Sequence, residues 1–376
     1  MTVVSGAALV TPSGVLHKSW LRIDGKSIAE IGRGTPPDED WVELDGGWLL
    51  PAYIDLHCHG GGGSDFSSPD PERIRNAALL HRQHGSAGML ASLVTAPIDD
   101  LCRQLVGIAD IVERGDSPLL GAHLEGPFLS NIRCGAQNPA FLLEPDAELF
   151  AELADAARGT LRMITIAPEL SGADEVIDAA VRRGILVAVG HSDATFAQAT
   201  HAFSRGAQVA THLFNGMRPV HQREPGPALA ALDFGVACEL IEDGVHVHPS
   251  LTRLVARNSP EQLILVTDAV SPTGVGDGLF TLGGQPITVV DGQARLTSGG
   301  SLAGSTLTMD AAVRHTVVTC GLSIMHASAA ASTNPARLLG IADRTGSLQV
   351  GRRADLLHLD ADLQIRRMMI GGAWTD

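Results

Sequence analysis

The stretch ILVAVGHSDATFAQATHAFSRGAQVATHLF, residues 185–214, contains two short apolar runs separated by a segment long enough for a helix. Such runs are typical of strands buried on both faces, and parallel strands need a connection of about a dozen residues, usually a helix. The stretch therefore predicts one β–α–β unit of a parallel sheet.

The same alternation begins at Pro51 and continues along the chain. The predicted strands are YIDLH near residue 53, MLASLVT near 89, LLGAHLE near 119, MITIA near 163, ILVAVGH near 185, VATHLF near 209, VACELI near 236 and LILVTDA near 263. Helical segments between them carry end signals, such as a start in Ser68-Pro69-Asp70-Pro71-Glu72 with a stop at Gly85, and a start at Ser171 with a stop at Gly184. Eight such strands close a barrel whose right-handed crossovers place every carboxyl end on one face. We expect an α/β protein with a TIM-like (β/α)8 barrel.

The two ends of the chain have a different texture. Residues 1–50 and 341–376 both read as short strands broken by turns. Because both ends are β-rich and flank the barrel, we expect them to pair into one small β-sandwich domain. The barrel then occupies residues 51–340, including a Gly-rich strand pair at 278–300 and two or three helices from about Thr306 to Gly340.

Composition excludes several classes of partner. The chain has 376 residues and a formal net charge of −15, which disfavours nucleic acid and anionic membranes because both need a basic footprint. No apolar run approaches the length of a membrane span, and no signal peptide is expected. The five cysteines are scattered and form no CxxC pair, which favours a reducing cytoplasm: Cys58, Cys102, Cys134, Cys238 and Cys320.

Residues that can bind a metal lie where the predicted strands end. His57 and His59 are two positions apart, so on a strand they point to the same face. Four others end the third, fifth, sixth and eighth strands: Glu125, His191, His212 and Asp268. An unpaired polar group in an apolar strand costs several kcal/mol, and a metal supplies the missing partner. Any one of these residues alone is more often a hydrogen-bonded structural residue, but the set of six favours a metal centre.

Longer motifs indicate more closely which class of metal-dependent enzyme this chain belongs to. Eight longer motifs, spread over nearly the whole chain, together resemble the N-acetylglucosamine-6-phosphate deacetylases of the amidohydrolase superfamily. They are GGWLLPAYIDLHCHG, HLEGPFLS, VGHSDAT, THLFNGM, EDGVHVHP, LVTDAV, SLAGS and GSLQVGRRADLLHLD. The resemblance implies hydrolysis of N-acetyl-D-glucosamine 6-phosphate to D-glucosamine 6-phosphate and acetate, in amino-sugar catabolism and cell-wall sugar recycling. It also implies a metal-activated hydroxide, because a bound metal lowers the pKa of water from about 15.7 toward 7.

The resemblance also assigns roles to the metal-binding residues. Glu125, His191 and His212 would form the main metal site. His57 and His59 would hold a second metal, with Glu125 bridging the two and Asp268 close to both. Some members of the family lack the HxH pair and use one metal, so its presence favours two divalent ions, with zinc first and Fe, Mn, Co or Cd as alternatives. Asp268 would act as general base and then as general acid.

Further residues match family positions that meet the substrate. Arg223 and His246 resemble the family's phosphate ligands, and the resemblance also suggests a homodimer in which Arg223 reaches the neighbouring subunit's site. The other positions expected to contact substrate are Ala136, Gln137, Asn215, Gly216, Met217, Asp243, Gly244, Val245, Leu302, Ala303 and Gly304.

Two residues need separate treatment. Many relatives have His where this chain has Gln137, which can still donate a hydrogen bond but cannot carry a proton. Cys134 lies in a stretch that reads as a loop over the site, and either a role there or an ordinary small residue fits the sequence.

Two rival interpretations keep the fold. Relatives that act on dihydropyrimidines, hydantoins or isoaspartyl peptides carry a carboxylated lysine between the metals, but this chain has only Lys18 and Lys26, both in the N-terminal β segment. A barrel that had lost catalysis would have lost metal ligands, whereas all six positions retain them here. We therefore expect an enzyme.

Overall fold

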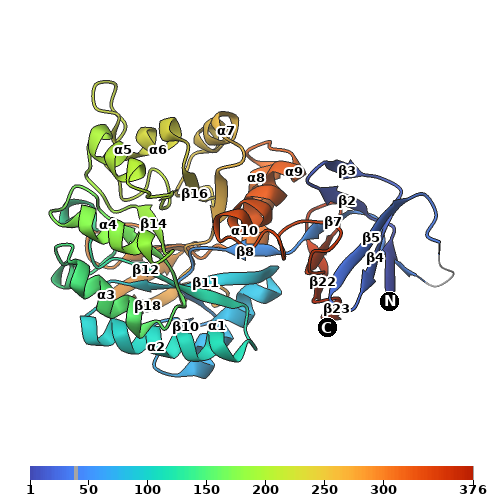
Figure 1. Ribbon diagram of the computed structural model, residues 1–376, viewed down its shortest axis with the longest axis horizontal. Coiled ribbons are helices and arrows are strands. Elements are labelled where there is room, and N and C mark those ends of the chain that lie inside the picture. Colours follow the sequence, from blue (N-terminus) through green and yellow to red (C-terminus); the bar gives the residue numbers. More distant parts are fainter. Residues whose placement is uncertain (38–40, 376) are drawn as a thin grey trace.

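The computed structural model describes residues 1–37 and 41–375, and it contains a barrel beside a smaller β unit (Figure 1). The eight barrel strands are parallel neighbours in chain order, from β8 through β11–β17. They are β8 (Tyr53–Asp55), β11 (Ser86–Val94), β12 (Leu119–Glu125), β13 (Leu161–Ile166), β14 (Leu186–Val189), β15 (Val209–Ala210), β16 (Ala237–Ile241) and β17 (Leu263–Val266). All eight predicted strands are confirmed.

The barrel closes just beyond the ends of its first and last strands. Asp268 N donates to His57 O at 2.8 Å, and Cys58 and Ala269 form a parallel bridge. This closure places the residues after β8 beside those after β17, so two of the predicted ligand segments are held together by backbone hydrogen bonds.

Helices cover the outside of the barrel (Figure 1). They are α1 (Pro71–Gln83), α2 (Ile98–Arg114), α3 (Ala147–Ala156), α4 (Ala173–Arg182), α5 (Phe196–Ser204), α6 (Gly226–Phe234), α7 (Pro249–Asn258), α8 (Met309–Val318), α9 (Ile324–Ser328) and α10 (Asn334–Leu338), with a π-helical turn, η3 (Ala329–Thr333), between α9 and α10. α1 begins at Pro71, within the predicted start at residues 68–72, and the Asp70 carboxylate accepts from Glu72 N and caps the helix. The N-cap of α4 is Gly172 rather than Ser171.

The two chain ends meet in the β unit, drawn in blue and red in Figure 1. One sheet has the order β5-β4-β1-β6 and the other the order β23-β22-β21-β7-β2-β3. β7 (Trp48–Pro51) pairs antiparallel with β21 (Leu356–Leu359), so the second sheet contains strands from both termini. The remaining strands are β1 (Thr2–Ser5), β2 (Ala8–Thr11), β3 (Gly14–Leu16), β4 (Ser19–Asp24), β5 (Ser27–Arg33), β6 (Val42–Glu43), β22 (Ile365–Ile370) and β23 (Ala373–Thr375).

Apolar side chains from both sheets form one buried cluster, which includes Leu21, Leu49, Leu356 and Met369. The β-sandwich built from both termini is thus confirmed. The domain boundaries at residues 50 and 340 stay predictions.

The predicted strand pair at 278–300 is wrong in one respect, because the segment forms three strands. They are β18 (Gly278–Leu282), β19 (Gln285–Val290) and β20 (Gln293–Leu296). Two tight turns at Gly283-Gly284 and Asp291-Gly292 have positive φ at all four residues, and such turns reverse the chain within two residues. We call the three-stranded sheet β18–β20 the flap, because one of its residues, Leu282, forms part of the wall of the cavity described below.

Smaller elements complete the chain. They are the two-stranded pair β9 (Gly60–Gly61) and β10 (Ser64–Asp65), and the 3₁₀ turns η1 (Asn131–Arg133) and η2 (Pro139–Phe141). No helix in the described part of the chain has the length and apolar character needed to cross a membrane.

Candidate active site

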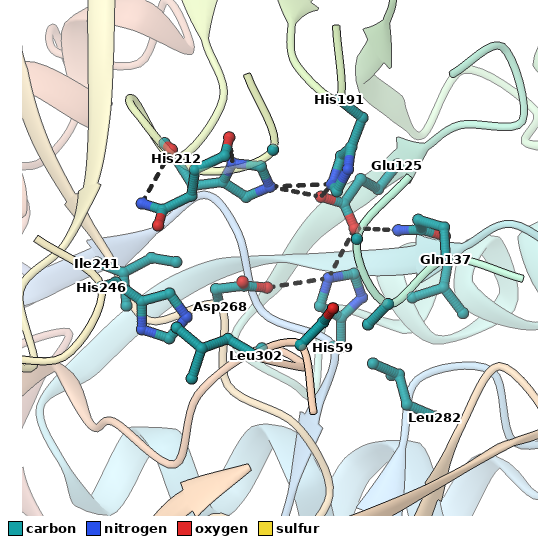
Figure 2. A pocket seen from close by; sticks show the side chains of 17 residues that line it. His59, Glu125, Gln137, His191, His212, Ile241, His246, Asp268, Leu282 and Leu302 are labelled. Carbon is teal, nitrogen blue, oxygen red and sulfur yellow. Dashed lines mark hydrogen bonds and ion pairs between the residues drawn. The ribbon is translucent and has the colours of Figure 1, made fainter. Parts of the chain in front are cut away.

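A cavity of about 320 Å³ lies at the carboxyl ends of the barrel strands. Figure 2 shows that His59, Glu125, His191, His212 and Asp268 point toward one another in this cavity. Active sites of (β/α)8 barrels lie on this face. His57 is fully buried beneath them.

Glu125 joins the cluster on one side through a single carboxylate oxygen. Its Oε1 lies 3.0 Å from His191 Nε2 and 3.1 Å from His212 Nε2, and the two Nε2 atoms are 3.1 Å apart. These three residues come from the ends of β12, β14 and β15, as the sequence predicted.

The second cluster shares the same carboxylate. The Nε2 atoms of His57 and His59 are 3.1 Å apart. His57 Nε2 lies 3.4 Å from Glu125 Oε1, and His59 Nε2 lies 3.2 Å from Glu125 Oε2. Asp268 Oδ1 lies 3.4 Å from His57 Nε2 and 3.2 Å from His59 Nε2. Glu125 therefore lies between two sets of ligand-type atoms.

The other ring nitrogen of each imidazole faces an acceptor. Nδ1 of His59, His191 and His212 lies 2.9–3.2 Å from a backbone carbonyl oxygen, namely that of Ser92, Arg133 and Asn215, respectively. Nδ1 of His57 lies 3.2 Å from Glu239 Oε2. With Nδ1 donating its hydrogen, each neutral ring presents the Nε2 lone pair to the centre, and this is the arrangement of metal-ligating histidines.

The facing Nε2 pairs test whether a cation fits. Within each pair, one Nε2 can donate a hydrogen bond to the other only if it carries a proton. A divalent cation can instead bind the lone pairs of both Nε2 atoms together with the Glu125 carboxylate. The ligand atoms of His57, His59 and Glu125 lie within 4.8 Å of one another, and so do those of Glu125, His191 and His212. Imidazole nitrogens and carboxylate oxygens are the donors that zinc and similar ions take. The residues therefore fit two cations that share Glu125.

Electrostatics within the cluster are dominated by its carboxylates and imidazoles. Burial alone would raise the pKa of Asp268, but the His57 and His59 rings lower it below its usual range. Burial alone would lower the pKa of His59, yet hydrogen bonds to Asp268 and Glu125 raise it to about 9. The carboxylates also raise the pKa of His57 and His191, so a cation competes with protons for these three rings.

The backbone is strained where three of these side chains turn inward. His191, His212 and Asp268 have φ of 46°, 28° and 49°, in the left-handed region that costs non-glycine residues about 1–3 kcal/mol each. All three follow the last residue of a strand by two positions. Strain of this kind is typical of functional sites.

The predicted substrate contacts divide into two groups. Seven of them line the cavity: Ala136, Gln137, Asn215, Gly216, His246, Leu302 and Gly304. Of those outside the lining, Met217 and Ala303 are buried in apolar clusters, and Asp243 accepts from His246 Nδ1 at 2.7 Å. The remaining three are Gly244, Val245 and Arg223, and Cys134, for which the sequence left a role open, also lies outside the lining. Cys134 O accepts from Gln137 N, so its turn helps to place Gln137.

Gln137 is tied to the cluster itself. Its Nε2 donates to Glu125 Oε2 at 2.5 Å, and its Oε1 accepts from Thr95 N at 2.8 Å. The backbone donor fixes the orientation of the amide, so the NH₂ group always faces Glu125. Gln137 thus positions the shared carboxylate at the wall of the cavity.

Arg223 does not reach the cavity of its own chain. Its side chain is exposed in the β15–α6 segment, and among the described residues it forms no ion pair. Its predicted contact with substrate is not formed by the cavity lining of its own chain.

Sequence reasoning missed the layer of residues that holds the ligands from below. Glu239 contacts His57, Asp55 accepts from Thr267 Oγ1 at 2.6 Å, and His123 lies between Ser92 Oγ and Thr165 Oγ1 at 2.9 Å from each. All are buried. Glu239 in VACELI gave the same signal as the predicted ligands, a charged residue in an apolar strand.

A separate group of ligand-type residues lies beside α8. Glu242 Oε1 accepts from His315 Nδ1 at 2.9 Å and from Cys320 Sγ at 3.2 Å, and Glu242 Oε2 accepts from Thr252 Oγ1. Each donor here already has the carboxylate as its partner, so this buried charge is compensated without a cation.

Comparison with known proteins agrees with this geometry. Residues 48–375 match the model of the amidohydrolase family.

The chain belongs to the amidohydrolase family.

Among curated relatives of this family member, N-acetylgalactosamine-6-phosphate deacetylase of Escherichia coli O157:H7 is 38% identical over 98% of both chains. N-acetylglucosamine-6-phosphate deacetylase of Bacillus subtilis is 34% identical over 96% of this chain and 94% of its own. The crystal structure of N-acetyl-D-glucosamine-6-phosphate deacetylase from Mycobacterium smegmatis has a TM-score of 0.95 and 41% identity, with complete coverage of both chains. A mutant of that enzyme, solved in complex with N-acetyl-D-glucosamine-6-phosphate, has a TM-score of 0.95 and 42% identity over 99% of this chain and 98% of its own. This amidohydrolase is a metal-dependent amide hydrolase.

Proposed function

We propose that this enzyme hydrolyses N-acetyl-D-glucosamine 6-phosphate to D-glucosamine 6-phosphate and acetate, in amino-sugar catabolism and cell-wall sugar recycling. The observation that carries the proposal is the convergence of Asp268, Glu125 and three imidazoles in one cavity, with His57 buried beneath them, in a chain whose relatives of 34–42% identity bear deacetylase names. Acetate release from the phosphorylated sugar, measured alongside the unphosphorylated sugar, tests it.

Asp268 performs the proton transfers. Its carboxylate faces the point on which the Nε2 atoms converge, and the lowered pKa keeps it ionised at neutral pH. Bound divalent cations supply Lewis-acid polarisation of the amide carbonyl and lower the pKa of the attacking water. Asp268 takes the proton of that water as general base and then hands it to the departing amine as general acid. Gln137 holds Glu125 in place during both steps.

The donor set supports two cations, and we take zinc as the resident ion. Zinc prefers imidazole nitrogen with carboxylate oxygen, and the sites divide into His57/His59 and His191/His212 around Glu125. Fe, Mn, Co and Cd accept similar ligands, and metal analysis of the purified protein distinguishes them. Exhaustive chelation should abolish acetate release.

The phosphate needs local cations in a chain with a formal net charge of −15. His246 supplies one donor at the cavity wall. For the second we propose a homodimer in which Arg223 enters the neighbouring subunit's site. The exposed position of Arg223, outside the lining of its own cavity, supports this arrangement.

A second substrate is favoured by one specific observation. The Escherichia coli relative that is 38% identical over 98% of both chains is named for N-acetylgalactosamine-6-phosphate, the 4-epimer of the glucosamine compound. Comparing kcat/KM for the two 6-phosphates decides which is preferred. We place the reaction in the cytoplasm, which the five unpaired cysteines support.

A further inference from the structure

Glu239 is a buried carboxylate that the mechanism above does not use. It lies in β16, is fully buried, and accepts through Oε2 from His57 Nδ1 at 3.2 Å and from the backbone N of His212 at 3.3 Å. Its Oε1 has no hydrogen-bond partner among the described residues. Burying a carboxylate with so few donors costs folding energy, so stability alone does not account for a glutamate at this position.

The contacts of Glu239 distinguish His57 from the other imidazoles. His59, His191 and His212 each direct Nδ1 to a neutral backbone carbonyl. Only His57 of these four directs Nδ1 to a carboxylate. A carboxylate behind a ligating imidazole fixes the Nδ1–H tautomer and makes Nε2 a stronger donor than a carbonyl does.

We infer that Glu239 is a positioning residue that sets the cation affinity of the His57/His59 position through His57. Its second hydrogen bond, to the backbone of His212, ties the orientation of that support to the other cation position. The inference rests on the proposed two-cation centre. The two cation positions should then differ in affinity, because only the His57/His59 position receives the added negative charge of Glu239.

The negative charge of Glu239 can be removed while both of its hydrogen bonds are kept. In Glu239→Gln, the amide oxygen can take the place of Oε2 and keep both donors, while the NH₂ group takes the place of the unpartnered Oε1. Glu239→Met fills a similar volume but accepts no hydrogen bond. The pair therefore separates charge from positioning.

Glu242→Gln is the matched control. Glu242 is also a fully buried glutamate, it directly follows the same strand, and its partners Thr252, His315 and Cys320 lie outside the candidate metal centre. Its replacement should lower thermal stability and leave the affinity for both cations at the wild-type values.

The experiment titrates metal-free protein with Zn²⁺ against a chromophoric chelator, and repeats the titration with Co²⁺ to follow the ligand-field absorption of each position. Wild type should bind two equivalents with separable affinities. Glu239→Gln should weaken the equivalent bound at the His57/His59 position by about 10-fold and Glu239→Met by about 100-fold, with a changed Co²⁺ spectrum for that equivalent only. Circular dichroism confirms that each variant is folded.

Any of four outcomes would overturn the inference. The charge of Glu239 has no role if Glu239→Gln binds both cations as wild type does. A general effect on folding, rather than a positioning role, is indicated if both cations weaken equally, or if Glu242→Gln reproduces the change. If wild type binds a single equivalent yet releases acetate, the two-cation centre fails while the deacetylase proposal stands.

Discussion

In the proposed mechanism, both proton transfers depend on Asp268. In Asp268→Asn the side chain keeps its shape and loses its basicity, so kcat should fall by roughly 10²- to 10⁴-fold while KM changes little. Steady-state kinetics and metal analysis on the same preparation check this. Asp277→Asn, at an exposed acid nine residues further along, is the control and should be fully active. A near-normal kcat for Asp268→Asn would assign the proton transfer to another group.

His81 illustrates how a buried residue outside the ligand set makes stability depend on pH. Burial lowers the pKa of His81 to about 4, and the ring, beside Cys58, contacts Gly60 O at 2.9 Å. The unfolded chain, with an ordinary histidine pKa of about 6.5, binds this proton more readily, so folding stability falls as pH drops from about 6.5 to 4. The loss amounts to about 3 kcal/mol and is absent above pH 7.

Urea unfolding at several pH values, with His81→Gln for comparison, measures this effect. The variant keeps a donor for Gly60 O but has no titrating ring. Its stability should therefore decline less steeply than that of wild type between pH 7 and pH 4. Parallel curves for the two proteins would mean that His81 does not titrate in this range.

At the scale of elements, the flap closes one side of the cavity. Leu282 lines the cavity (Figure 2). Gln285 Nε2 donates to the carbonyl oxygens of Ala136 and Gln137 at 3.2 and 3.3 Å. The flap therefore holds the segment that carries Gln137. Sequence identified this segment as β-forming but could not give its contact, because Gln285 lies 148 residues from Gln137.

Gln285→Ala removes both hydrogen bonds to that segment. Together they are worth about 1–3 kcal/mol, so KM should rise by at least about 5-fold and at most about 150-fold, with metal content unchanged. Kinetics with the 6-phosphorylated sugar provide the measurement. Gln293→Ala, on the same small sheet, loses only an acceptor for Arg295 and should behave as wild type. If both variants raised KM equally, the flap would stabilise the protein in general and would not specifically hold the segment that carries Gln137.

At the scale of the whole molecule, the proposed dimer makes a quantitative prediction. Arg223→Ala subunits should have a raised KM, and Asp268→Asn subunits a low kcat, so each is nearly inactive at low substrate. When the two exchange randomly, half of the dimers are mixed, and one site in each mixed dimer regains both native residues. Roughly a quarter of all sites should recover activity under two-fold symmetry.

Subunit exchange must be shown independently, for example with differently tagged chains. If exchange is complete and mixing restores nothing, every site carries its own Arg223 and the shared-site arrangement is wrong. Size-exclusion chromatography with light scattering tests the dimer itself.

The sequence by itself determined the eight barrel strands, the terminal β segments and the residue types at the strand ends. Parallel strands are buried on both faces, so they appear as apolar runs, and a charged or ligating residue in such a run is visible without a structure. The three-strand flap was less visible, because two adjacent tight turns resemble one Gly-rich loop.

Only the tertiary structure decided which group supports which ligand. Glu239 and His57 are 182 residues apart, and His212 and Glu125 are 87 apart. Their contacts depend on barrel closure between β8 and β17 and on the inward turn of residues with positive φ, and neither leaves a local pattern in the chain. Gln137 shows the same limit: its residue type was visible, but its position between Thr95 and Glu125 follows from how separate loops pack over the barrel.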